Sequence, residues 1–171
     1  AIADICDRDR RRLDVAFLGR YTASPYLVGP GGYYLRDRAT RKPLVWDSAR
    51  GAAVPYDTPD IVEAIEGRFE ADAVEIGPDD DVLGDGLLTG ETGLGKLVAH
   101  MAPYSPEWAE PICDVPAATI RRIANEFVDH AHIGETIDID GIRMPYRPVA
   151  VSLGKTVNNG WGGYECVWAR T

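Results

Sequence analysis

Cysteine and histidine are scarce in this chain, with three residues of each among 171. The cysteines, Cys6, Cys113 and Cys166, lie far apart and form neither a CxxC pair nor a Cys/His spacing typical of metal sites. Their odd number argues against a disulfide-bonded scaffold, and a reducing compartment would suit them. We therefore expect the isolated chain to hold no metal ion.

Long apolar runs and an excess of positive charge are also missing. No apolar stretch approaches the roughly 20 residues that a membrane span needs, although 45% of the residues are hydrophobic. The formal net charge is -9, so the average surface repels a nucleic-acid backbone. The basic stretch at 8–14, RDRRRLD, is interrupted by acids and is interpreted as a solvated helix face. We expect neither a membrane span nor a nucleic-acid partner in this segment.

Apolar residues near the start of the sequence have helical spacing from the first turn onward. Ile2, Ile5, Leu13 and Phe17 fall at roughly helical intervals, and the chain begins without Met. The last residues, YECVWART, have the pattern of a helix that is only beginning. We therefore expect residues 1–22 to be helical and the whole chain to be an internal segment of a larger protein.

Residues 23–103 are rich in Pro and Gly, which predicts an irregular excursion with short strands and helices. Strand-like runs at 32–36 and 43–47 flank a polar turn and suggest a small hairpin with apolar contacts from Tyr33, Leu35, Leu44 and Trp46. The rest is expected to be a short helix at 58–67, a strand at 68–77, an exposed acidic loop at 78–93 and a helix at 94–104.

Clearer patterns follow. Residues 104–132 are expected to be helical, because SPE and VPA motifs start two helices. One apolar stripe on the second helix is formed by Ile120, Ile123, Ala124, Phe127 and Val128. Residues 135–171 are expected to hold a hairpin around Asp140-Gly141, an apolar strand, a Gly-rich loop and the start of a helix. Helices and strands alternate, so the predicted fold class is α/β.

The sequence GETGLGKL at 90–97 has the GxxxxGK spacing of a phosphate-binding loop. Such a loop needs a preceding strand, and a Ser or Thr after the lysine to hold magnesium. Leu97 occupies that last position, and the residues before Gly90 look too interrupted for a central strand. We interpret the segment as a flexible loop capped by Lys96.

Few other residues suggest chemistry. His130 and His132 could form a metal pair, but no third ligand is near, and a helix end, where positive charge favours the dipole, explains them as well. His100 stands alone, and the acids at 79–81 are interpreted as solvated. No Ser/His/Asp or Cys/His set can be recognised by its spacing.

The loop at 154–163 is the best candidate site. It follows the apolar run PVAVSL, which is typical of a central strand. In α/β proteins such a loop brings backbone N–H groups and a helix N-terminus to a ligand. Its glycines allow close approach, Asn158 and Asn159 offer amide groups, and Lys155 offers charge for a phosphate. A long structural turn with Trp161 folded on the core explains the same residues equally well.

Three phrases resemble the molybdopterin oxidoreductases of the dimethyl sulfoxide reductase family: FLGRYTASPYLV, YSPEWAEPICDVPAATIRRIANEF and RPVAVSLGKTVNNGWGGYECVWART. They occur in the family's order and span Phe17 to Thr171, and the last is similar to the thiosulfate and polysulfide reductase branch. The resemblance implies a partial three-layer sheet-and-helix domain from a larger multidomain enzyme. That enzyme would carry out two-electron oxygen- or sulfur-atom transfer at molybdenum or tungsten held by two pterin guanine dinucleotides.

By the same resemblance the Gly-rich loop contacts the cofactor. The family's metal ligand, its iron–sulfur cysteine cluster and its C-terminal cofactor domain match nothing in this chain, so we expect no catalytic residue, no bound cofactor and no activity in the segment alone. The implied partners are the rest of the parent chain and an iron–sulfur electron-transfer subunit. Val157 and Asn158 stand near the position of a Gln-His pair found in formate and nitrate branches, so their catalytic details do not carry over. The implied cofactor-binding residues are Gly154, Lys155, Thr156, Asn158, Asn159 and Gly160.

A different class of function also fits the residues. The chain could be a stand-alone, non-enzymatic α/β module that uses the same loop to bind a nucleotide-like ligand. The substrate stays open in either case. So does the compartment, because family members work on both sides of the bacterial inner membrane.

Overall fold

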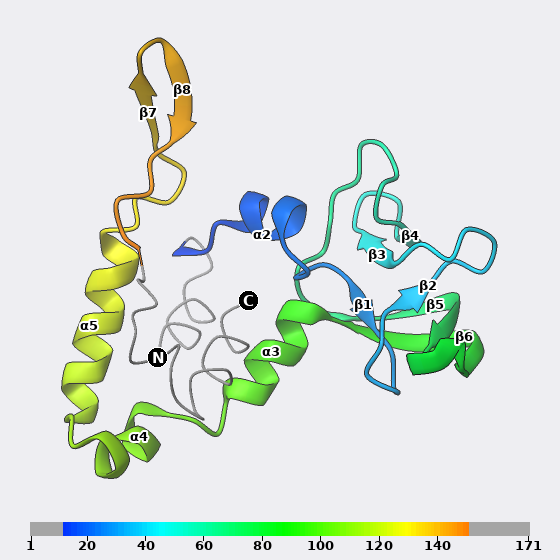
Figure 1. The fold of residues 1–171 in the computed structure, drawn as a ribbon, viewed down its shortest axis with the longest axis horizontal. Coiled ribbons are helices and arrows are strands. Elements are labelled where there is room, and N and C mark those ends of the chain that lie inside the picture. Colours follow the sequence, from blue (N-terminus) through cyan, green and yellow to red (C-terminus); the bar gives the residue numbers. More distant parts are fainter. Residues whose placement is uncertain (1–11, 151–171) are drawn as a thin grey trace. The chain divides into compact units, whose positions relative to one another are not determined.

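The computed structural model describes residues 12–150. The chain divides into two compact units, residues 1–125 and 126–171. Helices and antiparallel sheets both occur (Figure 1), so the fold is mixed α/β, as predicted. None of the helices in the described range is long and apolar enough to cross a membrane. In chain order the elements are α2 (Val15–Tyr21), β1 (Leu27–Val28), β2 (Leu35–Arg36), β3 (Leu44–Asp47), β4 (Ala52–Pro55), β5 (Arg68–Ile76), the 3-10 turn η2 (Pro78–Asp80), β6 (Val82–Thr92), α3 (Gly93–Met101), α4 (Pro106–Cys113), α5 (Ala117–Asp129), β7 (Thr136–Ile139) and β8 (Ile142–Pro145).

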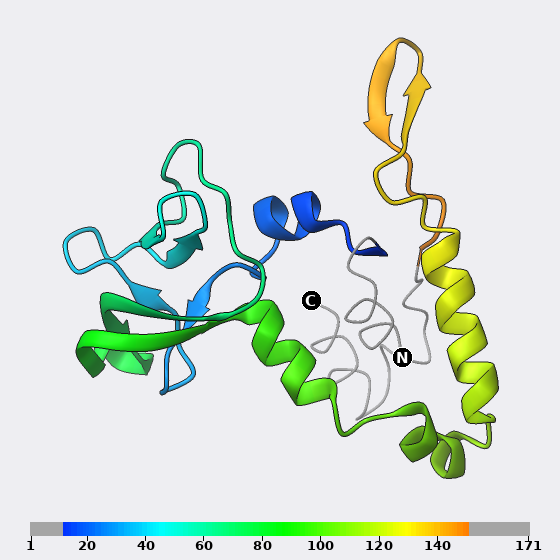
Figure 2. The same cartoon turned by 180° about the vertical axis from the view of Figure 1, so that it is seen from behind.

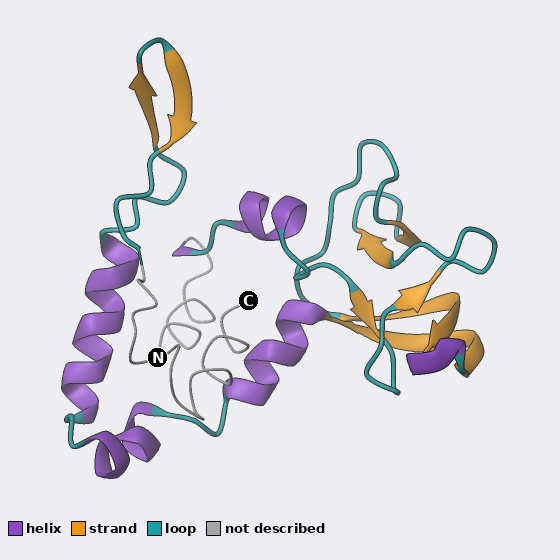
Figure 3. Cartoon of the chain, in the orientation of Figure 1, coloured by secondary structure: helices purple, strands orange, loops and turns teal. Residues whose placement is uncertain are grey.

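The strands of the first unit form one small β structure (Figure 3). Its main sheet has the order β1-β6-β5-β2, with antiparallel pairing throughout. A bridge between Val28 and Tyr34 joins the two edges of this sheet, so the sheet closes on itself. The β3–β4 hairpin is attached by a bridge from Tyr26 to Val45 and another from Arg36 to Pro43.

This β structure encloses an apolar core. Leu27, Leu35 and Leu44 are at most 3% exposed and meet the small side chains of Ala71 and Ala73. The core therefore confirms Leu35 and Leu44 as apolar contacts, as predicted, whereas Tyr33 is 40% exposed. Trp46 also packs here, with its ring stacked on that of Phe69 at 4.4 Å, and the other partly buried contributors are Ala53 and Leu88.

The prediction of an exposed loop at 78–93 is wrong, because most of this segment forms strand β6. Its burial alternates along the strand, but glycines occupy inward positions where a sequence pattern expects apolar side chains. Gly90 shows why: a Cβ there would lie 2.7 Å from Leu35 Cδ1 and 2.9 Å from Leu27 Cβ. Small residues on this face let the two long strands lie against the leucine core.

Two further expectations for the excursion need correction. The segment 58–67 is not helical: it runs beside β3, where the Ser48 amide donates to Val62 O and the Ala64 amide to Trp46 O. A helix of one or two turns has little stability of its own, so the hydrogen bonds to β3 determine the conformation of this segment. The strands at 32–36 and 43–47 exist but are not each other's main partners, since β2 pairs with β5 and β3 with β4.

The helices predicted from residue 94 onward are confirmed. Thr92 and Ser105 cap α3 and α4 by accepting from the amides of Gly95 and Trp108. In α5 the stripe residues Ala124 and Val128 are buried, whereas Ile123 is 53% exposed, so the stripe was predicted too wide at that position. Seen from behind, β6 runs directly into α3 (Figure 2). Of the helix predicted at 1–22, the described part is α2, and residues 1–11 lie outside the described range.

An ion pair joins α4 to α5, and it makes stability depend on acid. Arg121 donates to the Glu107 carboxylate at 2.7 Å and lowers its pKa from 4.5 to about 2. A lowered pKa means that the stabilisation is complete above pH 4.5 and is lost as the pH falls toward 2. We expect Arg121→Gln to remove the part of the acid sensitivity that falls in this window. Urea unfolding midpoints at pH 6, 4 and 2.5 test it, and equal pH profiles for both proteins would contradict it.

The hairpin predicted around Asp140-Gly141 is confirmed in the second unit. Both turn residues have positive φ, 53° for Asp140 and 79° for Gly141, as a type I′ turn requires. The pairs Ile137–Met144 and Ile139–Ile142 place all four apolar side chains on one face. The strand, loop and helix start predicted after residue 150 lie outside the described residues.

Candidate functional site

The cofactor-type residues predicted from sequence, Gly154, Lys155, Thr156, Asn158, Asn159 and Gly160, lie outside the described residues. Their predicted role stays a prediction.

The GxxxxGK segment at 90–97 is neither a phosphate loop nor a flexible loop. It spans the end of β6 and the first turn of α3. The amides that would face a phosphate already have acceptors: Gly93 N donates to Tyr26 O, Leu94 N to Ser24 O, and Gly95 N to the Thr92 hydroxyl. A nucleotide phosphate would have to break these bonds, so the segment is a structural junction.

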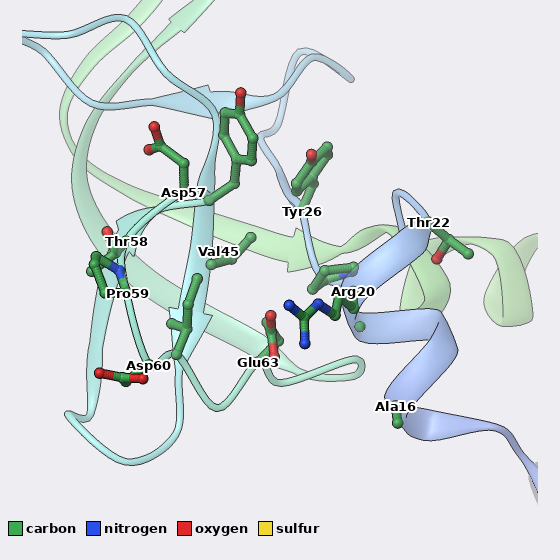
Figure 4. A pocket seen from close by; sticks show the side chains of 14 residues that line it. Ala16, Arg20, Thr22, Tyr26, Val45, Asp57, Thr58, Pro59, Asp60 and Glu63 are labelled. Atoms are coloured by element: carbon green, nitrogen blue, oxygen red, sulfur yellow. The ribbon is translucent and has the colours of Figure 1, made fainter. Parts of the chain in front are cut away.

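A pocket of about 610 Å³ lies between α2 and the segment 56–63 (Figure 4). It is the main candidate for a binding site in the described part of the chain. No histidine or cysteine lines it, and among the described residues its acids belong to no group of three or more side chains that could hold a metal ion. The lining residues are Ala16, Gly19, Arg20, Thr22, Pro25, Tyr26, Val45, Tyr56, Asp57, Thr58, Pro59, Asp60, Ile61 and Glu63.

One wall of the pocket is fixed by a buried carboxylate, Asp47, at the end of β3. Asp47 is 0% exposed and accepts from the amides of Ala49 and Val62 and from the Arg50 guanidinium. Burial by itself raises the pKa of Asp47, but these donors outweigh it and hold the pKa below its usual value. Arg50 also reaches Pro59 O at 3.1 Å, so the carboxylate and the guanidinium together hold the wall in place.

The charged groups of the pocket come from both walls. Arg20 projects from the last turn of α2, and Figure 4 shows it reaching toward the side that Glu63 lines. Asp57 is paired with Lys42, which lowers the pKa of the carboxyl. Asp60 adds a third acid to the lining. The pocket can therefore hold a small polar molecule by charge, with acids outnumbering the one arginine.

Two tyrosine rings, Tyr26 and Tyr56, also line the pocket. Tyr26 packs edge-to-face against Tyr34 at 5.1 Å and Tyr56 at 5.9 Å. Partial burial, followed by the neighbouring Tyr56 and Tyr34 hydroxyls, raises the pKa of Tyr26 above 10.0. Its hydroxyl therefore stays protonated near neutral pH and can donate a hydrogen bond.

A second buried carboxylate, Glu75, has a structural role. It is 2% exposed and accepts from the amides of Gly31 and Tyr33, both at 3.0 Å. The turn comes so close that a Cβ on Gly29 would lie 2.5 Å from the Glu75 carboxyl carbon. Glu75 thus fixes the turn between β1 and β2 and is not open to a substrate.

The three histidines contact other residues of this chain. His130 Nδ1 lies 2.7 Å from Glu126 O, and His132 Nδ1 lies 2.9 Å from a Glu135 carboxylate oxygen. His100 is exposed and contacts the Tyr104 ring. Between residues 12 and 150, no group of three or more His, Cys, Asp or Glu side chains could hold a metal ion.

The sequence alone does not indicate the pocket, because its residues come from the segments 16–26 and 56–63 and from Val45, which are far apart in the chain. The phrase RYT contains Arg20 and Thr22, but nothing in its spacing indicates a pocket. The expected helix at 58–67 also concealed the second wall.

No protein-family model matches the chain. The chain is similar to a sulfite dehydrogenase component of the bacterium Allochromatium vinosum, with 30% identity over 132 residues. The match covers 69% of this chain and 12% of that protein, so the chain corresponds to a small part of its length.

Proposed function

We propose that this chain is a segment of a molybdenum- or tungsten-dependent oxidoreductase of the dimethyl sulfoxide reductase family. The observation that carries the proposal is the 30% identity with the sulfite dehydrogenase component, whose name denotes a redox enzyme. The family-like phrases in this sequence also support it, since FLGRYT, YSPEWAE and VNNGWGG occur in the family's order.

The segment's own contribution would be to hold the cofactor. Residues Gly154 to Gly160 combine glycines, amide side chains and the positive charge of Lys155. These groups suit a pterin guanine dinucleotide, whose pyrophosphate is best bound by backbone N–H groups and a cation. When bound, the cofactor supplies two-electron oxygen- or sulfur-atom transfer at its metal. As the family resemblance implies, the ligand to the metal would come from another part of the parent protein.

The proposed partners follow from the same assignment. The rest of the parent polypeptide would complete the cofactor site, and an iron–sulfur subunit would carry electrons. The alternative of a non-enzymatic nucleotide-binding module predicts the same loop but no metal. A reading frame that continues on both sides, with a cysteine-rich stretch upstream, supports the enzyme, whereas a start near Ala1 and a stop after Thr171 would contradict it.

In the full-length protein, Asn158→Ala and Asn159→Ala are expected to lower cofactor occupancy without unfolding the protein. Each loses a hydrogen bond to the ligand, which costs about 0.5–1.5 kcal/mol, or about 2- to 13-fold in affinity. Pterin released from each purified variant measures occupancy, and thermal unfolding checks the fold.

The control for these variants is Thr89→Ala, at an exposed position on β6. It should leave the pterin content unchanged. If Asn158→Ala and Asn159→Ala match this control in occupancy, the loop is a structural turn and the proposed cofactor contacts are wrong.

A further inference from the structure

The two ends of the segment 23–93 lie next to each other, and we call the contact between residues 23–28 and 91–94 the neck. Leu94 N donates to Ser24 O at 3.1 Å, and Gly93 N to Tyr26 O at 2.9 Å. β1 and β6 then continue the pairing at Leu27–Thr92 and Val28–Glu91. A Cβ on Gly93 would lie 2.5 Å from Ala23 O, so the two ends are in direct contact. α2 precedes this neck and α3 follows it.

Among residues 12–150, those that build the core of this region all belong to the region itself. Every member of the apolar cluster lies between Leu27 and Leu88. The buried carboxylates are satisfied internally as well, Glu75 by the turn at 31–33 and Asp47 by residues 49–62. An ion-pair clamp adds to this, with Arg38 bridging Asp72 at 3.2 Å and Asp85 at 2.7 Å.

We infer that residues 23–93 are an inserted β module, an accessory domain that folds and opens as its own cooperative unit. A domain can be inserted into a host chain without disturbing it when its two ends are adjacent and its core is built from its own residues. The span exceeds the roughly 50 residues at which independent domains begin. This inference goes beyond the proposed function and does not depend on it.

Native-state hydrogen exchange on the whole chain tests the module. Gly90→Ala pushes a methyl group into the leucine core, so the slow amides of β1, β5 and β6 should exchange together, about tenfold or more faster. The amides of α5 should keep their wild-type rates. If the side chains around Gly90 shift to accommodate the methyl group, the exchange rates of Gly90→Ala will not change. Leu35→Ala, at a site with 0% exposure, then serves as the destabilising variant in its place.

The matched control is Arg121→Gln, which removes the ion pair between α4 and α5. It should speed exchange in α5 and leave β5 and β6 unchanged. If Gly90→Ala or Leu35→Ala accelerates α5 by the same factor as β5 and β6, the chain opens as one unit and the module does not exist.

A deletion in the full-length protein gives a second readout, which rests on the proposed function. Replacing residues 25–91 by a short Gly/Ser linker should leave pterin content at the wild-type level, because Ser24 and Leu94, which a hydrogen bond joins, are both kept and a short linker can span the gap between them. Loss of pterin with intact folding would show that the region is part of the cofactor-binding body and not an accessory module. The exchange experiment is independent of pterin, so failure of the module and failure of the proposed function can be told apart.

Discussion

Replacing Glu75 by alanine is expected to lower the free energy of unfolding by about 1–3 kcal/mol for each backbone amide that loses its acceptor. The carboxylate is 2% exposed and accepts from the amides of Gly31 and Tyr33. Water cannot easily replace it, because Gly29 and Gly31 pack directly against the carboxyl group. The truncated side chain also leaves a void between the turn and β5. Urea unfolding followed by tryptophan fluorescence measures the loss.

Glu75→Gln is the matched control for this prediction. Its carbonyl oxygen can still accept one amide, while its NH2 group faces the other donor without bonding it. The expected order of stability is wild type, then Gln, then Ala. Equal stability of all three proteins would show that the turn does not depend on Glu75.

Asp47→Ala is expected to release the segment 48–62 from β3. The carboxylate is fully buried. It accepts hydrogen bonds from the amides of Ala49 and Val62 and pairs with the Arg50 side chain. Removing it leaves buried donors without an acceptor and frees the charge of Arg50. The segment should become sensitive to limited proteolysis, and the pocket wall at 56–63 should lose its fixed position.

Arg50→Gln tests the same site more gently, because the backbone donors keep their carboxylate. It should produce less cleavage in 48–62 than Asp47→Ala. Acid should mimic the Asp47 substitution: the pKa of Asp47 is lowered, so its contribution persists below 3.8 and disappears as the pH falls through the lowered value. A wild-type cleavage pattern in Asp47→Ala would refute this role.

The parts of the fold predicted from sequence are those with strong local signals. The strand at 68–76 alternates clearly, α4 has a Ser-Pro start, and the hairpin turn needs the positive φ that Asp140-Gly141 supplies. In each case the local pattern and the tertiary contacts favour the same structure.

The errors occur where tertiary contacts decide. β6 has glycine at inward positions because the leucine core leaves no room for a side chain at Gly90. Its sequence therefore lacks the apolar alternation of a strand. The segment 58–67 has helical composition, but hydrogen bonds from Ser48 and to Trp46 hold Val62 and Ala64 beside β3, in an irregular conformation. Neither cause can be read from neighbouring residues.

The candidate sites differ in the same way. The Gly-rich loop at 154–160 has a signal within one short stretch, so sequence could propose it. The pocket requires Arg20 and Glu63 to come together from different segments, and only the structure shows that they line one cavity. Likewise, the GxxxxGK spacing suggested a phosphate site, whereas the structure shows that its amides are already bonded.

We propose that the full-length protein containing this segment is a molybdenum or tungsten enzyme with two pterin guanine dinucleotides. Metal analysis by mass spectrometry, combined with chromatography of the released pterin, tests this on one purified sample. We expect about one molybdenum or tungsten atom and two pterin guanine dinucleotides per polypeptide. A correctly folded full-length protein with neither metal nor pterin, purified from cells that make the cofactor, would contradict it.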